Sequence, residues 1–317
     1  MQQQSIIVNI GGSNIQISKE CISNGDFTLK EQLTQGERSS VYKINLHDTQ
    51  GDYVVKFILL EDQLRIDDFK SEVENQLFFN SIGIGPKCID HTIFTISDIP
   101  EQIGVVIMEQ MKGSLEQYRD KISEDACYQI IFQLATMHSY NYAHLDIAPR
   151  NIFYYEKDNQ MKIQIGDYGT MRKYAPFDTL SKDSQSFINN IYQYYAMTYN
   201  ESIIPGDFDT FYDNMYYLDY TLLAINSKHI DENIYFKALI KCIVEHPGLF
   251  SNDTELENAF SPIRILTDRT DPNYVHGIDN KTKGTLNIER KNKEIFHKLR
   301  NLLDCMTLRD CMKQCIY

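Results

Sequence analysis

The 317-residue chain lacks a long apolar run, and its first residues lack the features of a secretory leader. A membrane-spanning helix needs about 20 consecutive apolar residues. Every apolar run in this chain is shorter, so we expect no membrane span. The start, Met1 to Gln4, has neither the basic nor the apolar region of a signal peptide. We therefore expect an intracellular protein, located in the cytoplasm.

Basic residues are scarce relative to acidic ones. The chain has 31 Lys and Arg against 44 Asp and Glu, which gives a formal net charge of -13. Such a charge repels the phosphate backbone of nucleic acids, and no basic cluster in the sequence offsets it. We therefore do not expect a nucleic acid as partner.

Cysteines do not form a regular framework either. There are seven of them, an odd number scattered over the chain, which favours reduced thiols over disulfides. The one cluster is Cys305, Cys311 and Cys315. Its spacing does not match the paired ligands of a zinc site, so we expect these cysteines to pack on a terminal helix.

Short apolar runs separated by Gly, Asn and Asp turns fill the first third of the chain, which predicts a meandering antiparallel sheet. One amphipathic segment, 67–80, interrupts them and predicts a helix packed on the sheet. Its expected buried face carries Phe69, Val73, Gln76 and Leu77. The expected strands are 6–10, 14–18, 27–33, 41–46, 53–60 and 104–108.

The periodicity lengthens after a boundary at Glu109 to Gly113 and predicts helices around 126–137 and 215–225. Between these helices, 152–155 and 161–165 flank a polar turn, which predicts a hairpin. A polar stretch with Pro and Gly at 268–283 is interpreted as a long loop. The whole pattern predicts an α+β fold of two lobes, a sheet lobe followed by a mainly helical lobe.

The stretch His144 to Asn151 places Asp146 five residues before an amide, and Asp167 follows beyond the hairpin in Asp-Tyr-Gly. One aspartate to orient a hydroxyl, with an Asn and a second Asp to hold magnesium, is the equipment of phosphoryl transfer. Asp-x4-Asn alone most often reflects turn or cap chemistry, so the combination carries the meaning. With these elements in the family's order over about two thirds of the chain, the sequence resembles the eukaryotic-type protein kinases.

This resemblance implies three regions: an N-terminal extension with short strands at 1–26, a kinase N-lobe at 27–110 and a kinase C-lobe at 111–317. The N-lobe is expected to be a small antiparallel sheet with one main helix. The resemblance also implies ATP and Mg2+ as cofactors and a protein as substrate. The Ile, Asn and Tyr content is typical of AT-rich genomes such as those of large DNA viruses and parasites; a viral member would act in the host cytoplasm or the virion.

The resemblance places the nucleotide contacts before the lobe boundary. Lys56, in Tyr-Val-Val-Lys-Phe, resembles the strand lysine that neutralises the α and β phosphates. Glu72 on the following helix is its preferred partner, and Glu74 is the alternative. The remaining implied contacts are Gly36 in the phosphate loop, Val41 over adenine, Met108 at the back of the adenine pocket, and the backbones of Glu109 and Met111.

The same resemblance assigns the chemistry to the two motifs. Asp146 is expected to accept the hydrogen bond and then the proton of the acceptor hydroxyl, while Asn151 and Asp167 coordinate Mg2+. Arg150 is expected to neutralise the transferring phosphate. Asp213, at the start of a long apolar helix, resembles the buried aspartate that fixes the catalytic-loop backbone, with an ordinary helix cap as the alternative.

Three departures from the family pattern bear on control and acceptor choice. Leu145 replaces the Arg before the catalytic aspartate, which removes the cation that captures a phosphorylated activation segment. Ala148 replaces the Lys of Ser/Thr kinases, while Arg150 stands where tyrosine kinases carry their cation. No Ala-Pro-Glu closes the activation segment, for which Ile204 to Asp207 is the nearest candidate. The tyrosines of this segment are interpreted as packing residues rather than phosphorylation sites: Tyr174, Tyr192, Tyr194 and Tyr195.

Three functions fit these residues. The first is an active protein kinase, with Ser/Thr favoured over Tyr as acceptor. The second is a small-molecule kinase of the aminoglycoside or choline type, which shares the His-x-Asp-x4-Asn loop but usually has an acidic residue where this chain has Tyr168-Gly169. The third is a pseudokinase scaffold, suggested by Thr34 and Ser39 in place of loop glycines and opposed by the intact metal ligands.

Overall fold

The computed structural model describes residues 5–18, 27–47, 50–95, 101–198, 207–213, 215–226, 230–250, 255–256 and 258–262. The expected loop at 268–283 and the three-cysteine cluster lie outside the described residues, as do residues 204–206 at the expected end of the activation segment. The chain forms two compact units. The first holds residues 1–113, 153–156 and 164–170, and the second holds residues 114–152, 157–163 and 171–317.

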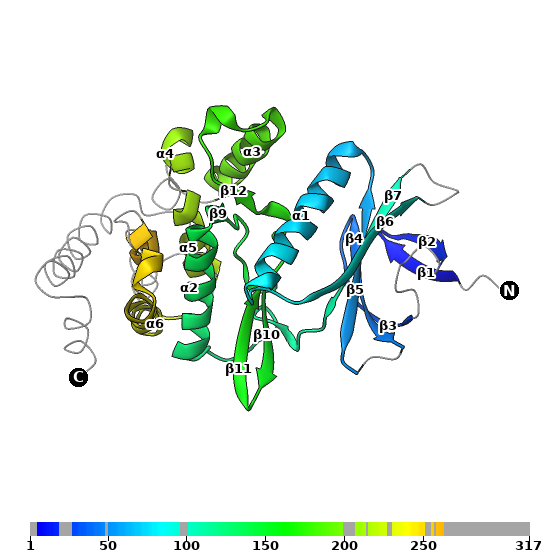
Figure 1. The fold of residues 1–317 in the computed structure, drawn as a ribbon, viewed down its shortest axis with the longest axis horizontal. Helices are drawn as coiled ribbons and strands as arrows, with labels where there is room; N and C mark the ends of the chain where they lie inside the picture. The colour runs from blue at the N-terminus through cyan, green and yellow to red at the C-terminus, as the bar shows by residue number, and fades with distance from the viewer. Residues whose placement is uncertain are drawn as a thin grey trace, which may run out of the picture. The chain divides into compact units, whose positions relative to one another are not determined.

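The first unit is built on a five-stranded antiparallel sheet with the strand order β3-β4-β5-β7-β6. Its strands are β3 (Phe27–Gln35), β4 (Ser39–Leu46), β5 (Tyr53–Leu60), β6 (Cys88–Thr95) and β7 (Gln102–Glu109), as Figure 1 shows. The strand β7, which lies between β5 and β6, is buried continuously from residue 103 to residue 107. Such a run is typical of a strand that is covered on both faces.

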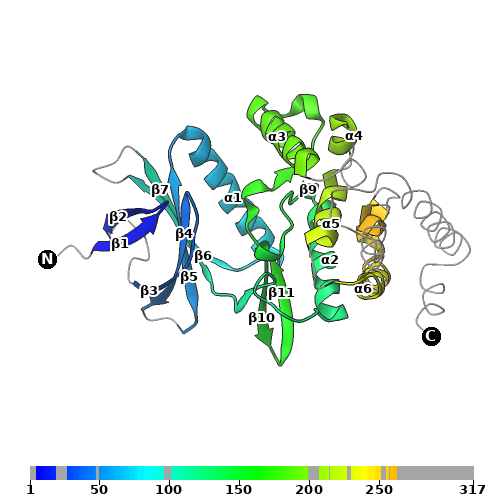
Figure 2. The same cartoon turned by 180° about the vertical axis from the view of Figure 1, so that it is seen from behind.

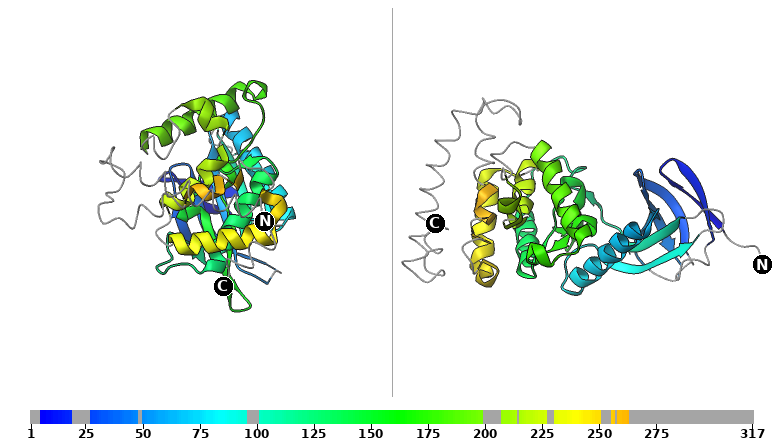
Figure 3. Two further views of the ribbon diagram at one scale, coloured as in Figure 1. Left: turned by 90° about the vertical axis from the view of Figure 1, so that its left-hand side faces the viewer. Right: turned by 90° about the horizontal axis from the view of Figure 1, so that it is seen from above.

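A hairpin of β1 (Ser5–Ile10) and β2 (Ser13–Ser18) packs on one face of this sheet, as Figures 1 and 3 show. Polar contacts fix its position. The Asn9 backbone N–H donates to the Tyr42 hydroxyl at 2.8 Å, and the Ser40 hydroxyl donates to the Asn9 carbonyl. Apolar residues of the hairpin and of the sheet form one cluster, which includes Ile6, Val8, Ile10, Ile17, Val55, Phe57 and Ile107.

Helix α1 (Gln63–Ser81) packs in a second apolar cluster together with β5 and β7. It begins earlier than the sequence predicted, because Asp62 caps it by accepting the Arg65 N–H at 2.9 Å. Phe69 and Val73 are 3% exposed, as expected. The expectation for Leu77 was wrong, since this side chain is 42% exposed.

The buried side of α1 includes the polar residue Gln76 in addition to the apolar residues Phe69 and Val73. Gln76 is buried because its amide donates to the Pro86 carbonyl at 3.0 Å. Phe79 is fully buried on the same side. A buried polar group with a partner costs little, so the helix presents a mixed face that apolar periodicity alone does not predict.

The second unit is mainly helical. Its helices are α2 (Glu124–Ser139), α3 (Lys182–Thr198), α4 (Phe208–Asp213), α5 (Met215–Asn226) and α6 (Glu232–Glu245). Helices α2 and α6 pack side by side, which can be followed in Figure 2. The helical periodicity of the sequence is confirmed, because its apolar positions on α2 are buried: Ala126, Ile130, Ile131, Leu134 and Met137.

Two small sheets flank the sequence motifs. Strands β10 (Ile152–Lys157) and β11 (Gln160–Ile165) form the predicted hairpin, in a sheet with the order β11-β10-β8 that also contains β8 (Gly113–Ser114). Strands β9 (Tyr142–Ala143) and β12 (Arg172–Lys173) pair with each other. The expected α+β class, a sheet region with one main helix followed by a helical region, is thereby confirmed. No described helix is both long and apolar enough to cross a membrane.

Candidate active site

Lys56 lies in the middle of β5, opposite Val41 on β4 and Val106 on β7. Its ammonium Nζ donates to Glu72 Oε1 at 2.7 Å and to Asp167 Oδ1 at 3.4 Å. Burial works against the charged form of Lys56, but the carboxylates of Asp167 and Glu72 outweigh it and raise its pKa. Lys56 is therefore cationic at every physiological pH. We refer to Lys56, Glu72 and Asp167 as the lysine cluster.

The sequence left two glutamates open as partners of the lysine. Glu72 makes the ion pair, whereas the side chain of Glu74 is exposed. Residues two apart on an α-helix point about 200° away from each other, so only one of them faces the sheet. The pair is half-buried, with side chains 18% and 14% exposed.

Asp167 has an uncommon backbone conformation with a φ of 66°, which costs a non-glycine residue about 1–2 kcal/mol. Its neighbour Tyr168 is 1% exposed and stacks on Phe79 of α1, with ring centroids 5.8 Å apart. The Tyr168 hydroxyl donates to the Ile165 carbonyl at 2.9 Å. Gly85 leaves room for this phenol, because a Cβ there would lie 2.0 Å from the hydroxyl. Its φ of 81° also favours glycine at this position. The buried ring holds the strained aspartate in place.

The turn between β3 and β4 carries Gly36. Its N–H donates to the Ser39 carbonyl at 2.8 Å and closes the turn. The φ of Gly36 is outside the left-handed region, and an added Cβ would meet Ser39 only at 3.5 Å. The turn itself does not require glycine, so any such requirement must come from the close approach of a ligand.

Met108 and the residues after it end the apolar run of β7. Met108 packs in the apolar cluster beneath α1. None of the backbone hydrogen bonds between described residues engages the N–H of Met111, which leaves this donor available. The neighbouring N–H groups of Glu109, Gln110 and Lys112 are used, each in a 2.9 Å bond, to the carbonyls of Lys87, Asp52 and Tyr154 respectively.

In the second unit the structure brings Asp146, Arg150 and Asn151 together. Arg150 Nη2 lies 2.7 Å from both carboxylate oxygens of Asp146. Asn151 Nδ2 donates to Asp146 Oδ2 at 2.8 Å and to the Asp146 carbonyl at 2.9 Å. The short helical turn Pro149–Asn151 returns both side chains to the aspartate. The carboxylate is held in one orientation while its side chain stays 22% exposed.

The backbone of this loop is fixed by Asp219 of α5, which is 0% exposed. Its two carboxylate oxygens accept the N–H groups of His144 and Leu145, each at 2.7 Å. These bonds hold Leu145 at a φ of 64°. The role expected for Asp213 was wrong, because Asp213 is exposed at the end of α4. The available signal was a carboxylate inside an apolar helical run, Tyr-Leu-Asp-Tyr.

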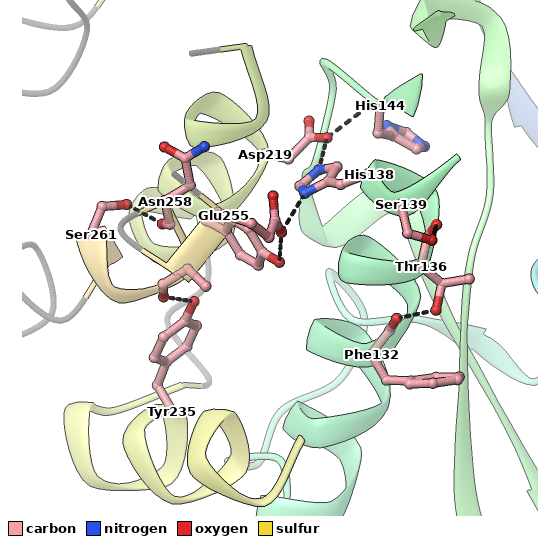
Figure 4. A network of polar contacts seen from close by, with 12 residues as sticks. Phe132, Thr136, His138, Ser139, His144, Asp219, Tyr235, Glu255, Asn258 and Ser261 are labelled. Carbon is pink, nitrogen blue, oxygen red and sulfur yellow. Dashed lines mark hydrogen bonds and ion pairs between the residues drawn. The ribbon is translucent and has the colours of Figure 1, made fainter. Parts of the chain in front are cut away.

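Figure 4 shows further buried contacts around Asp219. His138 Nε2 lies 3.1 Å from Asp219 Oδ2, and His138 Nδ1 lies 3.0 Å from Glu255 Oε1. Burial lowers the pKa of His138, but Glu255 and Asp219 outweigh this and raise it to about 9. Tyr220 donates its hydroxyl to Glu255 Oε1 at 2.7 Å. We refer to His138, Asp219 and Glu255 as the histidine cluster.

Tyr195 on α3 also reaches the loop from His144 to Asn151. Its hydroxyl donates to the Leu145 carbonyl at 3.0 Å and lies 3.5 Å from Asp146 Oδ1. The side chain is 6% exposed, so it packs as the sequence suggested, whereas the same expectation for Tyr194 was wrong, since Tyr194 is 61% exposed. The contact with the loop is additional, and nothing in the local sequence around Tyr195 signals it.

The residues expected to hold magnesium have suitable donor atoms. Asp167 offers a carboxylate that is 44% exposed. Asn151 turns its Nδ2 toward Asp146, which leaves its Oδ1 for a cation. Among the described residues, no group of three or more His, Cys, Asp or Glu side chains is placed to hold a metal.

A family model described as "Protein kinase domain" matches residues 27–193, slightly more than half of the chain. The chain belongs to the protein kinase domain family. The match contains the lysine cluster and the loop from His144 to Asn151, but it ends before Asp219 and Glu255.

Two relatives agree with this assignment. Serine/threonine-protein kinase PKH1 of Saccharomyces cerevisiae is 28% identical over 167 residues, which cover 50% of this chain and 21% of the yeast protein. Myosin light chain kinase A of Dictyostelium discoideum is 26% identical over 153 residues, which cover 45% of this chain and 50% of that protein. The similarity thus spans at most half the length of these relatives.

Proposed function

We propose that this kinase domain is an active, ATP- and Mg2+-dependent protein kinase that phosphorylates Ser or Thr hydroxyls. The observation that carries the proposal is the lysine cluster. A charged lysine held by Glu72 and reaching Asp167 is the arrangement that phosphoryl transfer requires of this fold.

In the first unit, Lys56 is proposed to bind the α and β phosphates and Asp167 to hold Mg2+. Bound Mg2+ supplies charge neutralisation for the phosphates. Val41, Met108 and the backbones of Glu109 and Met111 are proposed to surround adenine, and Gly36 to cover the phosphates. Support comes from the unused Met111 N–H and from the pairing of Val41 opposite Lys56 on adjacent strands.

In the second unit, Asp146 is proposed to orient the acceptor hydroxyl and to receive its proton. The hydroxyl oxygen forms a bond to the γ-phosphorus, the bond from that phosphorus to the β–γ bridging oxygen breaks, and ADP leaves. Arg150 holds the Asp146 carboxylate and places positive charge beside it. Asn151 is proposed to contribute its Oδ1 to Mg2+ while its Nδ2 keeps Asp146 oriented.

The preference for Ser and Thr rests on the relatives, since the yeast protein is named a serine/threonine-protein kinase. Arg150 is an observation in the opposite direction, because it occupies the position of the tyrosine-kinase cation and contacts Asp146 directly. Phosphoamino-acid analysis of labelled product decides between the two acceptors.

The activity test incubates the full chain with labelled ATP, Mg2+, a protein and peptide library, and small hydroxyl acceptors. Asp146→Asn is the inactive comparison, and we expect it to lose at least about a hundredfold in rate. Asp158→Asn is a matched control, because Asp158 lies in an exposed turn with a φ of 54° that Asn also tolerates. If no acceptor class is labelled above the Asp146→Asn background, the active-kinase proposal is wrong and the pseudokinase reading remains. Label confined to a small molecule would favour a small-molecule kinase.

A further inference from the structure

The histidine cluster places one imidazole between two buried carboxylates. The side chains of His138, Asp219 and Glu255 are 1%, 0% and 5% exposed. A neutral imidazole donates from only one ring nitrogen, whereas an imidazolium donates from both. Both nitrogens of His138 lie within 3.1 Å of a carboxyl oxygen, so the imidazolium donates to both carboxylates, whereas a neutral ring donates to only one of them. Its positive charge depends on both carboxylates.

Asp219 has two tasks that share one carboxylate. Its Oδ2 accepts both the His138 ring nitrogen and the His144 N–H, while its Oδ1 accepts the Leu145 N–H. A change in the hydrogen bond from His138 therefore acts on the same oxygen that holds the catalytic loop. Asp146 follows Leu145 directly in the chain, so the same hydrogen bonds also position the backbone of Asp146.

Glu255 is joined to this arrangement from a distant part of the sequence. It is separated from His138 by 117 residues and lies outside the segment 27–193 that the family match covers. Its Oε1 accepts hydrogen bonds from both His138 and Tyr220. Burial of a carboxylate this deeply costs free energy unless its charge is paired and hydrogen-bonded.

We propose that Glu255 is a positioning residue for the catalytic loop: its carboxylate keeps His138 as a cation, and that cation keeps Asp219 on the His144 and Leu145 amides. Glu255, which lies after the end of α6, thereby supports the catalytic loop from outside the segment that the family match covers. The proposal deepens the kinase function proposed above, and its first readout does not depend on that function.

The first test is amide hydrogen exchange of the full chain. Glu255→Gln keeps the shape and the acceptor oxygen but removes the charge. We expect exchange at His144 and Leu145 to become about tenfold faster or more, as for a local opening. Tyr235→Phe is the matched control, because it removes a 2.7 Å bond from Tyr235 to the Ala259 carbonyl without touching His138. That control is expected to leave exchange at both amides unchanged.

The second test is kinetic. Glu255→Gln is expected to lower kcat about tenfold, less than the hundredfold of a 1 Å misplacement, and to leave the KM for ATP unchanged within about twofold. It is also expected to move the alkaline loss of kcat to lower pH. The groups that face His138 are Asp219, Glu255 and the rings of Tyr216 and Tyr220; burial raises the pKa of both tyrosines, so they stay neutral in this range.

A folded Glu255→Gln protein with wild-type exchange at His144 and Leu145 overturns the proposal, whatever its activity. A wild-type chain without phosphoryl transfer instead overturns the proposed function, and the exchange result still decides the role of Glu255. If Glu255→Gln does not fold, Tyr220→Phe replaces it, since this change removes only the hydroxyl that donates to Glu255. A smaller rise in exchange at the same amides is then expected, and no rise overturns the proposal.

Discussion

Each unit of this kinase domain holds one cation between two carboxylates, and the two clusters differ in their access to solvent. In the lysine cluster the side chains of Lys56, Glu72 and Asp167 are 18%, 14% and 44% exposed. In the histidine cluster no side chain exceeds 5%. The same charges therefore stand in very different surroundings.

The difference separates two uses of an ion pair. The Asp167 carboxylate is 44% exposed and therefore accessible to a ligand, so the lysine cluster is suited to binding. The histidine cluster is closed, and Asp219 directs its remaining acceptor capacity to backbone amides. Removing one partner from a buried pair costs about 3–5 kcal/mol, whereas an exposed pair contributes about 1 kcal/mol or less. The lysine cluster should thus matter for activity and the histidine cluster for stability and loop position.

The largest effect is expected from His138→Gln, which leaves two buried carboxylates without a cation. Its free energy of unfolding should fall by about 3–5 kcal/mol, as measured by urea denaturation. His246→Gln is the matched control, since His246 is only partly buried and contacts the Phe132 ring and the Tyr128 hydroxyl but no buried carboxylate pair; its loss should stay below that of His138→Gln, at about 1 kcal/mol. Equal losses in the two variants would remove the distinction between the clusters.

Lys56→Met is expected to act on activity instead. The rate should fall about a hundredfold to a thousandfold, because one preorganised charge at the phosphates is lost, while the free energy of unfolding falls by less than in His138→Gln, because Lys56 and Glu72 keep 18% and 14% of their side chains exposed. Lys43→Met on the neighbouring strand removes the pair with Glu31 at 2.8 Å and should leave the rate unchanged. A wild-type rate in Lys56→Met would show that the lysine cluster has no part in catalysis.

The pH dependence of stability should come from the histidine cluster. The pKa of His138 is about 9 in the folded chain against 6.5 ordinarily. Its contribution is therefore complete below pH 6.5 and is lost as pH rises through 9, by about 3 kcal/mol at most. Lys56 contributes no change in the free energy of unfolding between pH 6 and pH 9, because its pKa is raised above the ordinary lysine value of 10.5. Denaturation curves from pH 6 to pH 9 measure the slope, which should flatten in Glu255→Gln.

The last comparison concerns the support of Asp167. Gly83 and Gly85 have φ values of 82° and 81°, but a Cβ would meet nothing within 4 Å at Gly83 and the Tyr168 hydroxyl at Gly85. Alanine at either position should cost about 1–2 kcal/mol for the backbone alone, and at Gly85 about 1–3 kcal/mol more for the clash. Thermal denaturation checks this. Gly85→Ala should also weaken ATP binding, whereas Gly83→Ala should not.

Elements with regular periodicity were predictable from the sequence, because helix and strand spacing directly reflects burial. The hairpin at β10 and β11 and the buried face of α2 are examples. The exposed position of Leu77 was not predictable in this way. The choice of face depended on a hydrogen bond from Gln76 to the Pro86 carbonyl, which no apolar pattern contains.

The residues of the candidate site also differ in how far the sequence predicts them. Lys56, Asp146 and Asp167 became candidates because their spacing in the sequence is itself the signal. Asp219 was missed in favour of Asp213, since both lie close to the start of α5 and only burial distinguishes them. Glu255 had no local signal, because its meaning comes from contacts with residues 117 and 35 positions away.

Helix α1 contacts both Lys56, through an ion pair, and Tyr168, through a stacked ring. Glu72 and Phe79 are seven residues apart, which is almost two full turns, so they share one side of the helix. One contacts the lysine and the other stacks on the tyrosine. A rotation of α1 about its axis would withdraw both contacts together. The ion pair of Lys56 and the stacking of Tyr168, the neighbour of Asp167, are therefore coupled through one helix, and a partner that rotates this helix would change both.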